Sequence, residues 1–210
     1  MNGELDAKVA EVLAAYDARS ADERRLHDAG WDADERRDRL LLRIGPDTGR
    51  LINILIKGAG ARRILEIGTS YGYSTVWLAE AARATGGRVV TLDLAQHKQD
   101  HARGMLERAG LATHVEWRTG DALELLKGLE GPFDFVLLDL WKDLYVPCFD
   151  IFAPKLAPRA IVVADNMLYP PMAQADAAAY RARVRRQPGI ESVMLEVGSG
   201  IYVSRYGPEG

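Results

Sequence analysis

The chain has 210 residues, of which 48% are hydrophobic and 27% are charged, and its formal net charge is -3 at pH 7. This composition is typical of a globular domain with a full core. It excludes a disordered chain and gives no electrostatic reason to expect a nucleic-acid partner. The single cysteine, Cys148, excludes an internal disulfide framework. We expect a cytoplasmic protein, because the sequence shows no signal peptide and no apolar run long enough to span a membrane.

The first 45 residues are predicted to form an N-terminal helical cap. Apolar residues recur at helical spacing in LDAKVAEVLAAYDAR, residues 5–19, and a second amphipathic pattern runs through DADERRDRLLLRI, residues 32–44. A turn at Gly45-Pro46 then precedes another apolar helix. We expect a single domain over residues 1–210, with its core in residues 46–210.

From Ala61 onward, short apolar runs alternate with helical patterns, which predicts parallel strands connected by helices. An α/β fold is therefore expected, with helices on both faces of a mostly parallel sheet. The segment ESVMLEVGSGIYVSRY, residues 191–206, predicts an antiparallel hairpin at the edge of that sheet, which gives seven strands. The five strands expected before the hairpin are RRILEIG (62–68), RVVTLDL (88–94), HVEWRTG (114–120), FDFVLLD (133–139) and AIVVADN (160–166).

The first of these strands ends in LEIGTSYGYS, where Gly68 and Gly72 bracket a tight turn before a helix. Glycines at such a turn let the backbone approach a ligand, and the helix that follows supplies free N–H groups. The spacing is not GxGxxG, so a pyrophosphate-binding loop is poorly supported. Glu66 also suits a ligand with a cationic amine better than one with phosphates. The alternative is an ordinary turn between a strand and a helix.

Acidic residues follow the second and third strands. Asp93 lies about 25 residues beyond Gly68, where a carboxylate can accept hydrogen bonds from both hydroxyls of a ribose. Asp121, in TGDAL, lies where an adenine could be held, by its side chain or by the backbone beside Ala122. Each acid could instead cap the helix that follows it. The glycine turn and Asp93 together favour a cofactor that contains a nucleoside.

The fourth and fifth strands end in Asp139 and in Asp165-Asn166. Parallel neighbouring strands would bring these side chains to the same edge of the sheet. Two carboxylates and an amide oxygen suit Mg²⁺ or another hard divalent cation. The four histidines and Cys148 are scattered and predict no zinc site. The alternative is that the two strand ends carry unrelated caps.

Trp141 and Lys142 follow Asp139 in the motif FDFVLLDLWKDLY. A lysine that is desolvated beside a cation can act as a general base. The alternative is a surface lysine that pairs with Asp143. Trp141 and the segment Tyr169-Pro170-Pro171 are predicted to wall a flat apolar pocket, unless they serve only to pack their loops.

These motifs resemble those of the small, cation-dependent class I O-methyltransferases that use S-adenosylmethionine, a family that includes catechol and caffeoyl-CoA O-methyltransferases. The segments ILEIGTSYGYST, FDFVLLDLWKDLY and IVVADNMLYP carry the resemblance, which runs from about Gly45 to Asn166 and continues in the terminal hairpin. It implies a Rossmann-like methyltransferase fold, S-adenosylmethionine as the methyl donor, and Mg²⁺ or another divalent cation as a second cofactor.

The resemblance also implies roles for individual residues. The cofactor would be held at its methionine part by Glu66, Gly68, Ser70 and Ser74 with Ile44 beside them, at its ribose by Asp93, and at its adenine by Asp121 and Ala122. The cation would be bound by Asp139, Asp165 and Asn166. The acceptor would be contacted by Trp141, Lys142, Asn166 and Pro170, and Lys142 would take its proton. A late carboxylate of the catechol enzyme aligns with Gly189, with Glu191 nearby.

The function that the resemblance implies is methyl transfer to one hydroxyl of a catechol-like or vicinal-diol small molecule, with Lys142 and Asp139 as catalytic residues. Two alternatives stay open. One is a tRNA hydroxyuridine O-methyltransferase, supported by the basic segment RARVRRQ, residues 181–187. The other is a catalytically silent module that binds S-adenosylmethionine. We expect a small phenolic acceptor and no membrane partner. A nucleic-acid partner is not favoured but stays open with the tRNA alternative, and the family is compatible with a homodimer.

Overall fold

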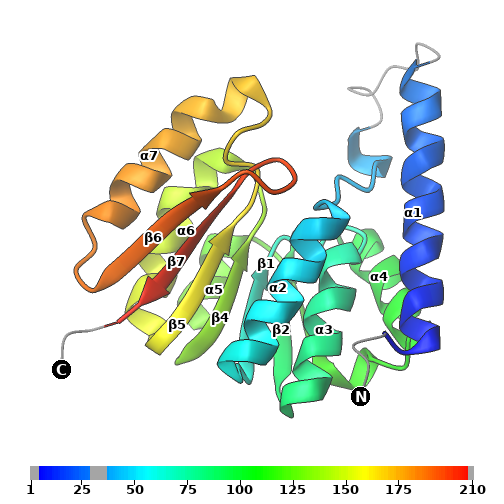
Figure 1. The fold of residues 1–210 in the computed structure, drawn as a ribbon, viewed down its shortest axis with the longest axis horizontal. Helices are drawn as coiled ribbons and strands as arrows, with labels where there is room; N and C mark the ends of the chain where they lie inside the picture. Colours follow the sequence, from blue (N-terminus) through cyan, green and yellow to red (C-terminus); the bar gives the residue numbers. More distant parts are fainter. Residues whose placement is uncertain (1–4, 29–36, 208–210) are drawn as a thin grey trace.

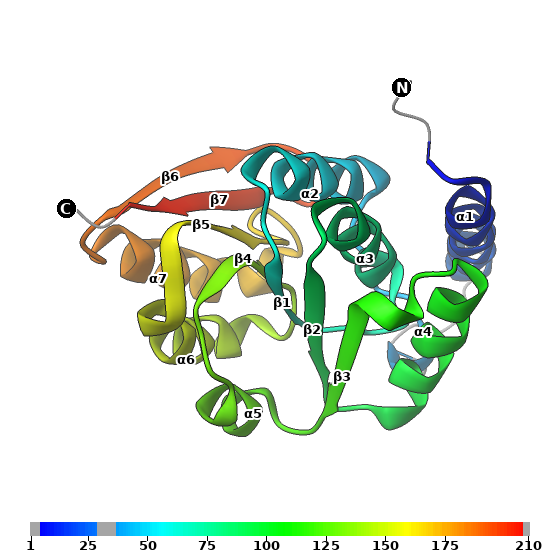
Figure 2. The same ribbon diagram turned by 90° about the horizontal axis from the view of Figure 1, so that it is seen from below.

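The computed structural model describes residues 5–28 and 37–207 of the chain. In these residues, seven strands form one sheet in the order β3-β2-β1-β4-β5-β7-β6, with helices on both faces (Figure 1, Figure 2). The first five strands in this order are parallel, and β7 is antiparallel to both of its neighbours. The α/β fold, the seven strands and the terminal hairpin predicted from the sequence are confirmed.

The strands are β1 (Arg63–Ile67), β2 (Arg88–Asp93), β3 (Val115–Thr119), β4 (Phe133–Leu138), β5 (Leu156–Ala164), β6 (Ile190–Leu195) and β7 (Ile201–Tyr206). The α-helices are α1 (Ala7–Asp28), α2 (Pro46–Ala59), α3 (Tyr73–Thr85), α4 (Gln96–Arg108), α5 (Ala122–Gly128), α6 (Tyr145–Phe152) and α7 (Gln174–Arg185). Short 3₁₀ turns include Arg37–Arg39 and Lys142–Leu144.

The central strand β4 shows why the strands are apolar without interruption. Phe135 and Leu137 belong to the core on one face of the sheet, and Val136 and Leu138 belong to the core on the other face. Successive side chains of a strand point to opposite faces, so a strand covered on both faces needs apolar residues at every position.

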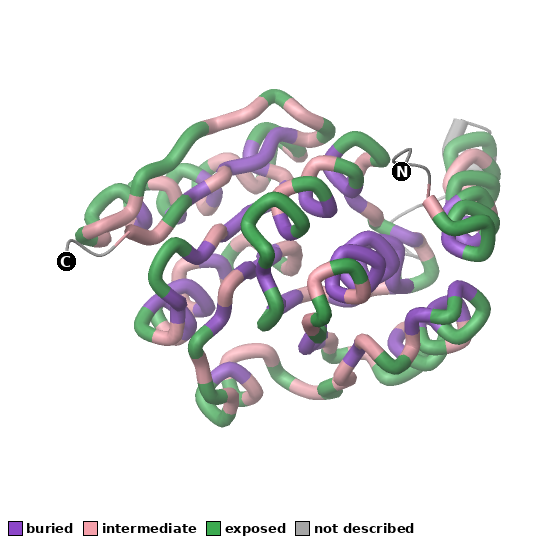
Figure 3. The backbone as a smooth tube through the Cα atoms, turned by 60° about the horizontal axis from the view of Figure 1, so that its bottom comes forward, coloured by how far each residue is buried: buried purple, intermediate pink, exposed green. Residues whose placement is uncertain are grey.

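Helices α2, α3 and α4 cover one face of the sheet, and α5, α6 and α7 cover the other (Figure 2). α1 packs outside α3 and α4 through an apolar stripe that includes Val9, Val12 and Tyr16. α3 is therefore enclosed by helices and sheet, and its residues 73–82 are all buried (Figure 3). Among the described residues, no helix has both the length and the apolar character needed to cross a membrane.

The second helix predicted for the N-terminal cap, over residues 32–44, is wrong in its described part. Residues 29–36 lie outside the described residues, one 3₁₀ turn follows, and residues 40–45 have no regular secondary structure. The backbone of Leu41 bonds to other elements instead: its N–H donates to the Glu23 carboxylate of α1 at 3.2 Å, and its carbonyl accepts from Ser70 Oγ at 2.9 Å. Leu42 has a φ of 44°, which a right-handed helix does not contain. We name residues 38–44 the strap.

The carboxyl ends of the parallel strands lie at one edge of the sheet, the upper edge in Figure 1. The turn between β6 and β7 reaches the same edge, because Tyr202 at the start of β7 pairs with Ala164 at the end of β5. In an open α/β sheet this is the edge at which ligands bind.

Candidate functional site

The residues that follow three of the parallel strands lie in a row along this edge. Gly68, Asp139 and Asp165 follow β1, β4 and β5, and the N–H of each donates to a carbonyl near the end of a neighbouring strand, at 2.9, 2.9 and 3.1 Å. These hydrogen bonds extend the sheet one residue beyond its strands. The predicted cofactor loop and the predicted cation-binding residues therefore share one edge.

Gly68 lies against the backbone of Asp139. Its φ is 107°, and a Cβ atom added at this position would lie 1.9 Å from the Asp139 carbonyl oxygen. Both the backbone conformation and the lack of space require glycine. The glycine predicted to let a ligand approach thus also brings β1 and β4 together.

A cleft lies between the strap and the loop that follows β1. Its lining residues are Leu41, Leu42, Arg43, Ile44, Gly68, Thr69, Ser70, Tyr71, Tyr73, Ser74 and Asp139. The structure thus brings Ile44, Gly68, Ser70 and Ser74, which the sequence assigned to the cofactor, together with Asp139. Apart from Ile44, the strap was not predicted to be part of the site. The apolar run LLRI directly before Gly45 was the available signal.

The strap is bonded both to the cofactor loop and to α1. Ser70 Oγ donates to the Leu41 carbonyl at 2.9 Å, and the Tyr71 hydroxyl donates to the Asp38 carbonyl at 3.1 Å. On the other side, Arg19 of α1 donates to the Arg39 carbonyl at 2.6 Å. A movement of the strap would therefore disturb both elements.

Glu66 is fully buried at the end of β1 and does not line the cleft. Its carboxylate accepts hydrogen bonds from the hydroxyls of Ser74, Thr75 and Thr91, each at 2.6 Å. Burial raises the pKa of the Glu66 carboxyl to about 7, although the three hydroxyl donors oppose this shift. Contact between Glu66 and the cofactor stays a prediction. The structure shows Glu66 organising the start of α3.

Asp93 joins the ends of β1 and β2. Its Oδ2 accepts from the Ser70 N–H at 2.7 Å, and its Oδ1 accepts from the Ala95 N–H at 2.8 Å. The N-cap of α4 is Ala95 rather than Asp93, so the helix-cap alternative does not describe this residue. Leu94, directly after it, is 77% exposed at the ligand-binding edge. Sequence reasoning missed Leu94, although its place after the acid of a predicted strand end was visible.

Asp121 is the N-cap of α5, and its side chain accepts from the Glu124 N–H at 3.0 Å. Ala122 is the first residue of that helix. The Gly120 N–H donates to the Asp93 carbonyl at 2.9 Å, so the two predicted adenine residues lie beside the end of β2. The helix-cap alternative describes the Asp121 side chain, and its role in binding adenine stays a prediction.

Asp139, Asp165 and Asn166 come together at the ends of the neighbouring strands β4 and β5. Asp165 is buried, and its Oδ1 has no hydrogen-bond partner among the described residues. Burial raises the pKa of both aspartates, and the charge of Asp139 raises that of Asp165 further. Within the described residues, no group of three or more His, Cys, Asp and Glu side chains could hold a metal, and the predicted set instead joins two carboxylates to one amide.

Lys142 lies between these groups. Its Nζ is 2.9 Å from Asn166 Oδ1, 2.6 Å from the Tyr145 hydroxyl, 3.0 Å from the Leu140 carbonyl and 3.5 Å from Asp139 Oδ1. Its side chain is only 11% exposed. The alternative of a surface lysine paired with Asp143 is therefore wrong, and the lysine instead belongs to the cluster at the sheet edge.

Large apolar side chains are exposed around this cluster. Trp141 is 58% exposed, and the loop after Asn166 carries Tyr169 at 62% and Met172 at 81%. Pro170 lies within the same loop, next to Tyr169. Exposed apolar surface beside buried charged groups is typical of a site for an apolar ligand.

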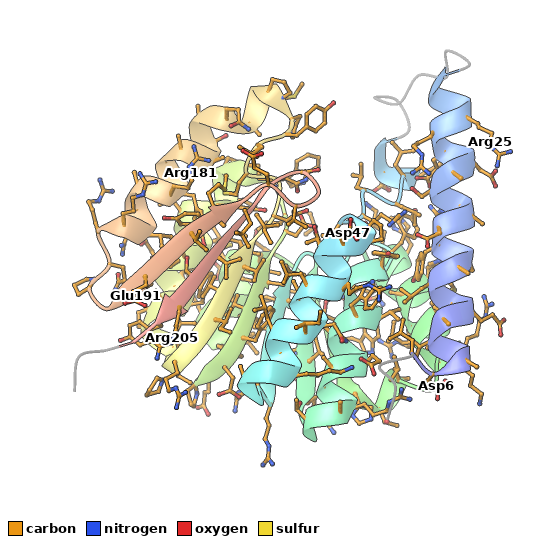
Figure 4. The ribbon with its side chains drawn as sticks, in the orientation of Figure 1. Asp6, Arg25, Asp47, Arg181, Glu191 and Arg205 are labelled. Atoms are coloured by element: carbon orange, nitrogen blue, oxygen red, sulfur yellow. The ribbon has the colours of Figure 1, made fainter. Side chains whose placement is uncertain are left out.

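Gly189 and Glu191 lie at the other end of the sheet, which corrects their alignment with an acceptor-binding carboxylate. Glu191 pairs with Arg205, where β6 begins and β7 ends (Figure 4). The alignment fails because β6 runs from the far end of the sheet toward the site. Glu196, which follows β6, is the acidic residue of the hairpin at the ligand-binding edge.

Two solved structures share this fold. The O-methyltransferase from Bacillus cereus, in complex with S-adenosylhomocysteine (SAH), has a TM-score of 0.74 and 29% identity, over 98% of this chain and 93% of that chain. The O-methyltransferase TomG from Streptomyces achromogenes, in complex with S-adenosylmethionine, has a TM-score of 0.76 and 26% identity, over 97% and 91% of the two chains. The Rossmann-like architecture is that of a class I methyltransferase.

Sequence similarity shows which family of class I methyltransferases the chain belongs to. The O-methyltransferase family model matches residues 19–206, and the chain belongs to the O-methyltransferase family. Catechol O-methyltransferase of Mycobacterium tuberculosis is 37% identical over 163 residues, 73% of each chain. Catechol O-methyltransferase of Niastella koreensis is 35% identical over 129 residues, which span 60% of this chain and 58% of that protein. The protein is an S-adenosylmethionine-dependent O-methyltransferase.

Proposed function

We propose that this enzyme methylates one hydroxyl of a catechol-like or vicinal-diol small molecule, with Mg²⁺ or another divalent cation held by Asp139, Asp165 and Asn166. The observation that carries the proposal is Asp165 Oδ1, a buried carboxylate oxygen with no donor among the described residues. Two relatives of this chain are named catechol O-methyltransferases, which supports the same class of acceptor.

The donor set fits a hard divalent cation. Carboxylate and amide oxygens are its preferred ligands, and Asp165 Oδ1 is unsatisfied where the two carboxyl groups meet. Burial disfavours the charge on both aspartates, so a cation beside them would stabilise their ionised forms. When bound, Mg²⁺ would favour the ionised form of an acceptor hydroxyl and orient two neighbouring oxygens.

Lys142 is the group of this chain placed to take the acceptor's proton. Its Nζ lies within 3.0 Å of Asn166 Oδ1, the Tyr145 hydroxyl and the Leu140 carbonyl. These contacts hold the amine in one position. A general base must lie within hydrogen-bond reach of the proton that it removes, and an acceptor hydroxyl bound at the proposed cation would lie beside Nζ.

The cofactor residues of the chain provide a binding surface from the strap to the end of β2. Ile44 and Gly68 line the cleft at the methionine end, and Asp93 stands at the end of β2 for the ribose. Leu94 adds an exposed apolar side chain that a flat adenine can cover. S-adenosylmethionine, when bound, supplies an electrophilic methyl group, and these residues would position it by binding the two ends of the cofactor.

Two of the four arginines in the basic segment make contacts within the protein, which weakens the support of this segment for the tRNA alternative. Arg183 pairs with Asp150 at 2.7 Å and lies over the Phe149 ring, and Arg181 donates to the Met167 carbonyl at 3.1 Å. These arginines of α7 stabilise the fold, as a helix face does. A silent cofactor-binding module would need neither a fixed Lys142 nor an unsatisfied Asp165, so catalysis is the better-supported function.

A methyl-transfer assay over catechols, caffeoyl esters, flavonoids and tRNA, with and without Mg²⁺, tests the proposal. We expect transfer to a catechol that EDTA abolishes and Mg²⁺ restores. Asp165→Asn is expected to lower this transfer at least about 100-fold, whereas Asp150→Asn, on the outer surface of α6, serves as the unaffected control. Full activity in EDTA would contradict the proposed need for a cation. Transfer to tRNA alone would contradict the proposed class of small-molecule acceptors.

A further inference from the structure

The cleft holds opposite charges on its two sides. Among the described residues that line it, Arg43 is the one basic side chain and Asp139 is the one acidic side chain. Arg43 belongs to the strap, and Asp139 belongs to the end of β4. A ligand with a positive and a negative group at one end would match this arrangement.

Arg43 has a donor that the protein does not use. Its Nη2 pairs with Asp17 of α1 at 2.9 Å, its Nη1 lies 3.4 Å from the Ile44 carbonyl, and its guanidinium lies over the Tyr73 ring. The side chain is only 11% exposed, and its Nε is buried without an acceptor among the described residues. A buried N–H without an acceptor is costly, so this group is a candidate donor for a ligand.

Three of the five hydroxyl groups among the residues that line the cleft are already committed as donors. Ser74 Oγ donates to Glu66, Ser70 Oγ donates to the Leu41 carbonyl, and the Tyr71 hydroxyl donates to the Asp38 carbonyl. None of the three hydrogens is left for an anionic ligand. Among the described residues that line the cleft, the Nε of Arg43 is the one side-chain polar atom that is buried without a hydrogen-bond partner.

We infer that Arg43 binds the carboxylate of the cofactor's methionine end through Nε–H, with the ammonium group of the same end toward Asp139. The inference rests on the proposed binding of S-adenosylmethionine in this cleft. A charge-assisted hydrogen bond from a guanidinium is strong and directional, so Arg43 would select cofactors that carry the amino-acid end. Arg43 is then a specificity-determining residue that also ties the strap to the bound cofactor.

Calorimetric titration with two ligands tests this role. SAH carries the amino-acid end, and 5′-methylthioadenosine shares its adenosine and thioether but lacks that end. We expect Arg43→Gln to weaken SAH binding roughly 10- to 100-fold and to change methylthioadenosine binding less than about threefold. Asp17→Asn, which removes the ion pair but keeps the Arg43 Nε–H, is the matched control and is expected to bind SAH within about threefold of the natural chain.

The titrations test the role of Arg43 separately from the proposed binding of the cofactor. An equal loss for both ligands in Arg43→Gln, or an unchanged preference for SAH, would overturn the role of Arg43. If Arg43→Gln does not fold, Arg43→Lys carries the same test, because lysine keeps a charge near Asp17 but has no Nε–H fork. Failure of the natural chain to bind SAH at all would instead contradict the proposed cofactor.

Discussion

Glu66 places an ionisable group where solvent does not reach it. Burial raises its pKa from 4.5 to about 7, the hydroxyls of Ser74, Thr75 and Thr91 partly oppose the shift, and the charge of Asp139 adds to it. Below pH 4.5 the carboxyl is protonated in the folded and unfolded states alike. Between pH 4.5 and about 7 the unfolded chain ionises the carboxyl while the folded protein keeps it protonated, so stability of about 3 kcal/mol is lost across this range, and the loss levels off above pH 7.

Glu66→Gln is therefore expected to change the pH dependence of stability. Glutamine cannot ionise, so the variant should gain roughly 2 to 3 kcal/mol over the natural chain between pH 5 and pH 8. Urea denaturation at both pH values measures this difference. If the free energies of unfolding of the two proteins change in parallel, the ionisation of Glu66 does not control stability in this range.

The sequence could locate some site residues and not others, for physical reasons. Asp139 and Asp165 each end an apolar run, and the parallel order of strands then brings them to one edge. Arg43 and Leu94 were missed although their positions beside predicted site residues were visible, because their relevance depends on which side chains surround them and how far they are exposed. The alignment that brought Gly189 and Glu191 near the acceptor was wrong, because residue spacing does not show which end of a hairpin lies near the site.

At the scale of elements, the hydrophobic pattern of the sequence predicted the strands of the sheet correctly, but it predicted a helix where the strap lies. The alternation of strands and helices from β1 to β5 follows from apolar runs and glycine turns, which are local signals. The strap has the composition of a helix, but its backbone bonds to Glu23 and Ser70, which are distant in sequence. Tertiary hydrogen bonds of this kind override local helix propensity.

The strap depends on α1 for its position, and this can be measured through the cofactor. Glu23→Ala removes the acceptor of the Leu41 N–H, so the strap should close less well over the cleft. We expect SAH to bind about 3- to 10-fold more weakly and to dissociate faster, as stopped-flow and calorimetric measurements would show.

Glu11→Ala is the matched control for that experiment. Glu11 also lies on α1 and pairs with Arg108 at 3.4 Å, but its side chain is 74% exposed and it does not contact the strap. An exposed ion pair contributes little, so SAH affinity should be unchanged. Equal effects of the two substitutions would show that α1 acts only through general stability.

At the scale of the whole molecule, two cores lie on the two faces of one sheet. The first core includes residues of α1, α2, α3, α4 and the strap, and the second core lies under α5, α6 and α7. Both cores meet at β1 and β4, whose carboxyl ends carry Gly68 and Asp139. The site therefore lies at the ends of buried strands, and we expect the strap and the outer loops to open more easily than this framework.

Hydrogen exchange should distinguish the segments that line the cleft from the rest of the sheet. Addition of SAH is expected to slow the exchange of amides in residues 38–44 and 68–74, because these segments line the cleft. Amides of the edge strand β6 should exchange at the same rate with and without SAH, since their side chains at 191–193 are exposed and far from the cleft. Uniform protection of the whole chain would indicate general stabilisation rather than closure of the strap.

The contact between Gly68 and the Asp139 carbonyl also bears on how such an enzyme diversifies. The methyl donor and the acceptor's ion are proposed to bind on either side of one backbone contact, which leaves no room even for a Cβ atom. The distance between the methyl donor and the acceptor is then set by this contact between two backbone segments. Substitutions at Trp141 and in residues 167–173, which leave Lys142 and Asn166 in place, can therefore admit new acceptors without changing that distance.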